Sequence, residues 1–187
     1  MSPTFPAGTR GAQIMSYKGA WPTIAEDAYV APGSSVIGNV TLGAESSVWF
    51  NCVLRGDDNF IKVGDRTNIQ DGTVIHVDGG KDWSVVIGND VLIGHMALIH
   101  GCRIEDWGFV GMGATLMNGV VVEPYAMVAA GALVTPNKRV TSRTLWAGRP
   151  AKPVRELTDE DIARNLEGLE HYVRLAKEFV KSETVRP

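Results

Sequence analysis

Three histidines lie in a short central stretch of the chain, which has 187 residues and four histidines in all: His76, His95 and His100. Three neutral imidazoles that leave one coordination position open are the ligand set of a catalytic zinc rather than of a structural one. Separate histidines that each hydrogen-bond a neighbour would need no metal. The choice between these two interpretations depends on whether the fold brings the rings together.

The elements that must position these rings are short repeats. Along most of the chain an aliphatic residue leads each group of about six, and a small residue stands at the fifth place. Such repeats are typical of a β-helix, in which each hexad forms one short strand and one turn. We therefore predict an all-β, parallel β-helix in which three hexads make one triangular coil. The leading residues are Val30, Val36, Leu42, Val48, Leu54, Val63, Ile69, Ile75, Ile87, Ile93, Ile99, Ile104, Val110, Leu116, Val122, Val128 and Val134.

The hexad register predicts which side chains stack in successive coils, once two short insertions are treated as loops. Arg55, His76 and His100 each follow a leading residue and fall into one such stack. Neighbouring strands lie about 4.8 Å apart, which is about the separation at which two side chains share a zinc ion. The register therefore predicts a metal site that contains His76 and His100.

His95 does not belong to this stack. It follows its leading residue, Ile93, by two places, and the register puts it above Asp71. A rigid prism does not turn all three rings of one chain onto one ion. We therefore expect a symmetric oligomer in which a neighbouring chain supplies the third ligand.

Composition restricts the classes of partner. The length suits one domain with a short appendage, and the net charge of −3 argues against nucleic acid or a membrane surface as partner. No apolar run approaches the length of a membrane span and no signal pattern is present, so we expect a cytoplasmic protein. Cys52 and Cys102 fall inside hexads at places that favour small residues, which predicts buried free thiols.

Polar residues gather at the predicted corners near the histidine stack. Arg55 and Asp57 flank a glycine and can form an ion pair, either as a surface cluster or as neighbours of the site one coil below His76. Gln70 and Asp71 are ordinary turn residues elsewhere. Here Gln70 can reach a hydroxide on the metal, and Asp71 can orient an arginine or a histidine.

Two other segments have more open interpretations. The stretch from Val77 to Ser84 adds residues to one coil, and it is either a plain solvated loop or a proton relay through Asp78 or Asp82. From Ile104 to Thr135 the hexads carry few polar residues, so this part is predicted to be scaffold.

The sequence divides into three parts. Residues 1–17 are predicted to be a flexible extension, residues 18–153 the β-helix with the metal site, and residues 154–187 a C-terminal helix and tail. Thr158 is a candidate N-cap, and an apolar stripe predicts a helix from about Asp159 to Lys181 packed along the prism. His171 and Tyr172 lie in it, and for His171 an ordinary helix-face role is the simpler interpretation.

Together these motifs resemble the gamma-class carbonic anhydrases. The hexads alone are shared with many acyltransferases, so the three-histidine spacing with Gln-Asp before it is the specific part. The resemblance covers residues 17–181 and implies a left-handed β-helix, a handedness that the repeat itself does not show. The motifs that carry it are Arg55-Gly56-Asp57-Asp58, Asn68-Ile69-Gln70-Asp71-Gly72, Ile75-His76, Ile93-Gly94-His95 and Ile99-His100-Gly101-Cys102.

The resemblance also implies an activity and an assembly. The activity would be the reversible hydration of carbon dioxide to bicarbonate by a metal-bound hydroxide. The assembly would be a homotrimer with zinc (or Fe²⁺ or Co²⁺) at each subunit interface. His76 and His100 would then come from one chain, and His95 from its neighbour.

The same resemblance implies roles for the polar residues. Gln70 would position the hydroxide, and the residues that hold the interface and the site would be Arg55, Asp57 and Asp71. Two departures from the family pattern stand out: the loop from Val77 to Ser84 is short and has no glutamate to shuttle protons, and Asp58 replaces a glutamate. Tyr172 lies in the region of a family asparagine.

Two other functions are compatible with the same repeat. One is an acyl-CoA-dependent transferase, which would need one catalytic histidine and would leave the register of three histidines unexplained. The other is a structural subunit that keeps the metal as a clasp between chains and has little activity.

Overall fold

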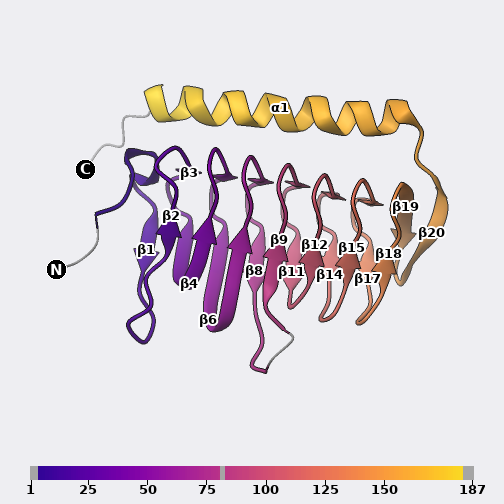
Figure 1. Ribbon diagram of the computed structural model, residues 1–187, viewed down its shortest axis with the longest axis horizontal. Coiled ribbons are helices and arrows are strands. Elements are labelled where there is room, and N and C mark those ends of the chain that lie inside the picture. Colours follow the sequence, from indigo (N-terminus) through magenta and orange to yellow (C-terminus); the bar gives the residue numbers. More distant parts are fainter. Residues whose placement is uncertain (1–3, 81–82, 183–187) are drawn as a thin grey trace.

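A computed structural model of the chain describes residues 4–80 and 83–182. Short strands wind into a triangular coil, successive coils stack along one axis, and a long helix lies beside the stack (Figure 1). Within the coils each strand pairs in parallel with strands of the coils before and after it, so the chain forms three flat faces. The molecule is a left-handed parallel β-helix, and the predicted fold class is confirmed.

The first face carries two of the three histidines. It begins in the first halves of two long strands that turn from one face to the next, β4 (Ser35–Leu42) and β6 (Val53–Val63). The shorter strands of this face are β1 (Gln13–Met15), β8 (Val74–His76), β11 (Leu98–His100), β14 (Thr115–Leu116) and β17 (Leu133–Val134).

The second face contains the second halves of β4 and β6, and the third face ends in an antiparallel pair. The other strands of the second face are β2 (Thr23–Ile24), β9 (Val85–Ile87), β12 (Arg103–Ile104), β15 (Val121–Val122) and β18 (Arg139–Val140). Those of the third face are β3 (Tyr29–Val30), β5 (Ser47–Val48), β7 (Asn68–Ile69), β10 (Leu92–Ile93), β13 (Phe109–Val110), β16 (Met127–Val128), β19 (Thr144–Gly148) and β20 (Ala151–Glu156).

The turns between the faces stack into three corners. The first corner joins the first face to the second and includes residues 55–60, 77–80, 83–84, 101–102 and 117–120. The second corner joins the second face to the third and includes residues 64–67, 88–91 and 105–108. The third corner joins the third face to the next first face and includes residues 70–73, 94–97 and 111–114.

The interior of the coil is filled by the aliphatic residues that lead the hexads, and every predicted leading residue is buried. Ile75, for example, has no exposed surface and stacks between Leu54 below and Ile99 above. Complete burial of such a side chain is worth about 1.5–3 kcal/mol, so the ladder of leads strongly favours one register. That register holds the polar residues next to the leads in fixed positions.

Helix α1 (Asp159–Ser182) covers the third face, and the predicted helix is confirmed. Its first turn is closed by a reciprocal cap, in which Thr158 N donates to Asp161 at 2.9 Å and Asp161 N donates to Thr158 Oγ1 at 3.1 Å. The helix is anchored by aromatic contacts, since the ring of Trp49 lies 5.4 Å from that of Tyr172 and 5.3 Å from that of Phe179.

The N-terminal region differs from the flexible extension that the sequence predicted for residues 1–17. Residues Ala7–Thr9 form a 3₁₀ turn, η1, and β1 pairs in parallel with β4. The Gln-Ile-Met sequence of β1 places Ile14 opposite Val36, against the core. The β-helix therefore begins before residue 17.

Both cysteines are buried free thiols, as predicted. Burial raises the pKa of Cys52 to about 12 and that of Cys102 to about 12, so neither is a thiolate at neutral pH. Among the described residues, no helix combines the length and the apolar character needed to cross a membrane.

Candidate metal centre

The register of the first face brings His76 and His100 together. His76 ends β8, His100 ends β11, and the two residues are direct partners in the parallel ladder, with Arg55 of β6 one coil below. The predicted stack is therefore confirmed. Nδ1 of His76 lies 3.0 Å from Nε2 of His100, and we call these two residues the histidine pair.

The second nitrogen of each ring in the histidine pair contacts a hydrogen-bond acceptor. Nε2 of His76 lies 3.1 Å from Oδ1 of Asp57, and a carboxylate can only accept. Nδ1 of His100 donates to Oδ1 of Asn118. The orientation of that amide is fixed on its other side, because Asn118 Nδ2 donates to Asp78 Oδ2 at 3.3 Å.

These partners determine the tautomers. His76 carries its proton on Nε2 and His100 carries its proton on Nδ1, so the two nitrogens that face each other both present lone pairs. Two lone pairs 3.0 Å apart repel each other unless a cation lies between them. Zinc–nitrogen bonds of about 2.0–2.1 Å to each would let one ion use both lone pairs, so the donor set fits a metal ion.

Asp57 is held as the anion that this arrangement needs. Partial burial would raise the pKa of its carboxyl, but hydrogen bonds from Arg55, the local backbone and His76 outweigh burial and lower that pKa below its usual value. The predicted ion pair with Arg55 is present. Asp58 is exposed, and its backbone N–H donates to Oδ1 of Asp57 at 3.0 Å.

His95 lies at the third corner, at the opposite edge of the first face from the histidine pair. Its Nδ1 contacts Oδ2 of Asp71 at 2.9 Å, which leaves the lone pair of Nε2 free. The predicted position above Asp71 is thus confirmed. Within residues 4–80 and 83–182, no group of three or more His, Cys, Asp or Glu side chains is arranged to hold a metal.

Two more of the predicted site residues belong to the His95 side. Gln70 is nearly buried beside Asp71, and with His95 and Met112 it lines an open groove of about 400 Å³. The ring of Tyr172 lies 5.4 Å from that of Trp49, where the third face meets the third corner, and burial and the charge of Asp71 raise the pKa of its phenol. The register had already set His95 and Asp71 apart from the histidine pair, and a single chain separates the predicted site residues into two groups.

Asn118 was not among the predicted site residues, because it lies in the part of the chain predicted to be scaffold. Asn118 stands 18 residues after His100, whereas the coil between them holds 17, because Ile99 pairs with Leu116. The register therefore puts Asn118 one residue past the position above His100, and a polar residue so close to the predicted stack was the signal that could have identified it. Asp82 of the predicted proton relay lies outside the described residues, and Asp78 contacts Asn118 rather than either ring of the histidine pair.

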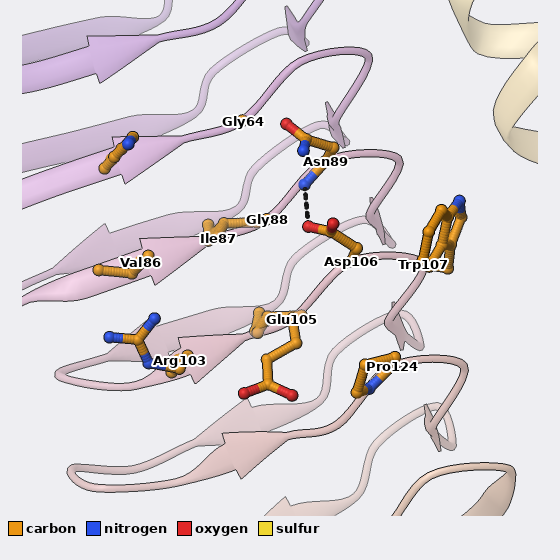
Figure 2. A pocket seen from close by; sticks show the side chains of 12 residues that line it. Gly64, Val86, Ile87, Gly88, Asn89, Arg103, Glu105, Asp106, Trp107 and Pro124 are labelled. Atoms are coloured by element: carbon orange, nitrogen blue, oxygen red, sulfur yellow. Dashed lines mark hydrogen bonds between the residues drawn. The ribbon is translucent and has the colours of Figure 1, made fainter.

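Two hollows on the surface differ in whether a predicted site residue lines them. One hollow, of about 430 Å³, lies at the second corner between Arg103 and Trp107, with Asn89 bonded to Asp106 in its wall and no histidine in its lining (Figure 2). A second, mostly apolar hollow of about 390 Å³ lies directly against His100. The histidine pair therefore has a hollow beside it that could hold a small molecule.

Comparisons with known proteins identify relatives of the chain. The chain is 50% identical over 173 residues to gamma carbonic anhydrase 2, mitochondrial, of Arabidopsis thaliana, covering 90% of the chain and 62% of the relative. It is 44% identical over 154 residues to a protein of Methanocaldococcus jannaschii named probable carbonic anhydrase, covering 82% of the chain and 96% of that relative. No protein-family model matches the chain.

A solved structure extends the likeness to three dimensions. A Bacillus cereus protein, provisionally named an acetyltransferase, superimposes with a TM-score of 0.90 at 35% identity, covering 92% of this chain and 99% of that one. The chain spans 62% and 66% of the lengths of the two Arabidopsis relatives named gamma carbonic anhydrase 2 and 1.

The expected cytoplasmic location is wrong by the same comparison. The Arabidopsis relatives named gamma carbonic anhydrase 1, 2 and 3 are all named mitochondrial, although bacterial relatives match as well. The expectation rested on the lack of a long apolar run and of a signal pattern. An absence of this kind does not determine where a protein resides.

Proposed function

The chain belongs to the gamma-class carbonic anhydrase family, and from this premise we propose that it hydrates carbon dioxide reversibly to bicarbonate at a divalent metal centre. The proposed ligands are the histidine pair of one chain and His95 of a neighbouring copy. The observation that carries the proposal is that His76 Nδ1 and His100 Nε2 lie 3.0 Å apart while the other nitrogen of each ring contacts an acceptor.

The choice of ion follows from the ligands. Three imidazoles and an open position favour zinc, although Fe²⁺ and Co²⁺ accept the same donors. A bound zinc ion supplies acidity, because it lowers the pKa of its water from about 15.7 to about 7.

The surrounding side chains orient the ligands before any ion binds. Asp57 and Asn118 fix the tautomers of His76 and His100, and Arg55 holds Asp57 in place as a carboxylate. At the third corner Asp71 does the same for His95. Each of the three rings is thus committed to present one lone pair.

A homotrimer would complete the site, because the two groups of residues lie at opposite edges of the same face. That face and its corners expose apolar side chains that a second copy would cover: Val74 is 38% exposed, Leu98 41%, Met96 75% and Met112 57%. A threefold axis facing the first face would bring the third corner of each chain to the first corner of the next. The proposed occupant of this surface is therefore another copy of the chain.

The substrate would be received on two sides. The apolar hollow against His100, lined by Leu98, Met117 and Pro136, suits a small uncharged molecule such as carbon dioxide. The amide of Gln70 lies beside His95 and has a donor and an acceptor with which to orient the attacking oxygen. Carbon dioxide would thus enter on the apolar side near His100, and the attacking oxygen would be oriented on the polar side near Gln70.

The test combines metal analysis with a hydration assay. Purified protein reconstituted with zinc, ferrous or cobalt ion should bind about one ion per chain and accelerate carbon dioxide hydration in a stopped-flow indicator assay. His76→Ala and His100→Ala should each lose the ion and the rate. A protein that takes up none of these ions stoichiometrically would overturn the proposal.

The same two measurements separate the alternatives. A transferase would need one histidine with a free nitrogen beside an acyl-donor groove, whereas here the free nitrogens of two histidines face each other. Protein that binds the ion but gives no hydration above background would be the structural clasp.

A further inference from the structure

Asn118 connects the histidine pair to the loop that follows β8. Its Oδ1 accepts from His100, and its Nδ2 donates to Asp78 Oδ2 at 3.3 Å. Asp78 is itself restrained, because its Oδ1 accepts from Gly79 N at 2.9 Å and its carbonyl accepts from Asn59 Nδ2 at 3.3 Å. The amide of Asn118 is therefore held from the side opposite His100.

Trp83 packs against the same corner. A Cβ atom on Gly101 would come within 3.4 Å of Trp83, and one on Gly119 would come within 3.1 Å of its ring. These two glycines directly follow His100 and Asn118, so the indole lies against the backbone beside their hydrogen bond. Trp83 therefore restricts movement of the backbone that carries His100 and Asn118.

The bond to Asn118 decides between two states of His100. A neutral imidazole has one N–H, and His100 has two acceptors within reach: Oδ1 of Asn118 on one side and Nδ1 of His76, 3.0 Å away, on the other. If the proton of His100 lay on Nε2 instead, that N–H would donate to Nδ1 of His76, and neither of the two facing nitrogens would keep a free lone pair. The histidine pair would then be closed to a metal.

We propose that Asn118 is a positioning residue that keeps the proton of His100 on Nδ1 and so keeps the histidine pair open for a divalent metal ion. This inference rests on the proposed metal centre. It concerns a residue that touches neither the ion nor the substrate and acts through His100.

The first variant is Asn118→Leu, which keeps the approximate size of the side chain and removes its hydrogen bonds. Its affinity for zinc, measured by competition with a chelating dye, should fall by about 10–100-fold. In metal-free trimer labelled with ¹⁵N-histidine, ¹⁵N chemical shifts should show the His100 proton moved from Nδ1 to Nε2. Asn39→Leu, an exposed change within β4, should alter neither quantity.

Rescue variants test the hydrogen bond itself. Asn118→Asp restores an acceptor for His100 but places a second carboxylate beside Asp78. Adding Asp78→Asn returns a donor to that contact, so the double variant should recover wild-type zinc affinity and the Nδ1 proton. Should Asn118→Leu fail to fold, an Asn118→Asp, Asp78→Asn protein with weak zinc binding would count against the proposal.

The outcomes distinguish this inference from the proposed function. If wild-type protein binds zinc and His76→Ala does not, but Asn118→Leu keeps both affinity and tautomer, the role of Asn118 is wrong and the metal centre stands. If wild-type protein binds no ion, both are wrong.

Discussion

Mixed trimers test whether the metal centre is shared between chains. His76→Ala removes a ligand from the first corner, and His95→Ala removes the ligand from the third corner, at the opposite edge of the first face. In a cyclic trimer each site would combine the first corner of one chain with the third corner of the next. A pure trimer of either variant should therefore have no complete site.

The expected yield follows from counting boundaries. A His95→Ala chain offers an intact histidine pair, and a following His76→Ala chain offers His95. Every mixed trimer has one boundary in that order, so it should bind about one ion, against about three for wild-type trimer. Mixed trimers that combine His76→Ala with His100→Ala should bind none, because every chain then spoils the pair that it must contribute.

The assay uses two differently tagged variants made in one cell and purified through both tags in turn, so that only mixed trimers remain. Bound metal is measured after free ion is removed, with trimer mass checked by sedimentation. If the His95→Ala and His76→Ala mixture assembles but binds nothing, the site does not combine two chains as proposed. If the His76→Ala and His100→Ala mixture bound as much metal as the His95→Ala and His76→Ala mixture, then His76 and His100 would not act as one pair.

Three further predictions follow from the same structure. Gln70→Ala should lower the hydration rate by about 10-fold or more while zinc content stays close to wild type, since Gln70 is placed to contact the reacting oxygen; loss of the ion itself would contradict this. Met112→Glu would bury a charge in the proposed interface and should shift the trimer to monomer in sedimentation velocity, whereas Val154→Glu, at a position 60% exposed on β20, should leave it a trimer. The carboxylate of Glu123 accepts a hydrogen bond from Ser142 N at 2.8 Å, and this bond lowers the pKa of Glu123 below the usual value. The contribution of Glu123 to folding stability is therefore present at neutral pH and is lost as pH falls through that lowered pKa. Glu123→Gln should cost about 0.5–1 kcal/mol in urea unfolding at pH 7 and nothing once wild-type Glu123 is protonated; an equal cost at both pH values would refute the assignment.

Much of this fold could be read from the sequence because its register is local. Each leading residue repeats at a fixed short interval, and burial of one lead forces the next into place. The stacking of His76 and His100 followed directly from that count. The C-terminal helix could be predicted equally well, since Thr158 specifies where it starts and an apolar stripe specifies the face that packs on the β-helix.

The register separated His95 and Asp71 from the histidine pair, but it did not place every residue of the site. The position of Tyr172 depends on which face the helix covers, and the register of the β-helix does not specify that face. The role of Asn118 depends on which nitrogen of His100 carries the proton, a property of contacts rather than of spacing. For β1, pairing with β4 outweighed a composition rich in glycine and proline.

The first corner joins the longest turn beside the histidine pair to one of the shortest. Eight residues, 77–84, follow β8, while only Gly101 and Cys102 separate β11 from β12. The separation of the two imidazoles is nevertheless set by adjacent strands, so the number of residues between β8 and β9 can change without altering it. Open space surrounds Gly79, where an added Cβ would meet no described atom within 4 Å. A peptide inserted after Gly79 would therefore leave the spacing of the two imidazoles unchanged, and its effect on the histidine pair would come through the turn residues Asp78 and Trp83 that lie beside Asn118.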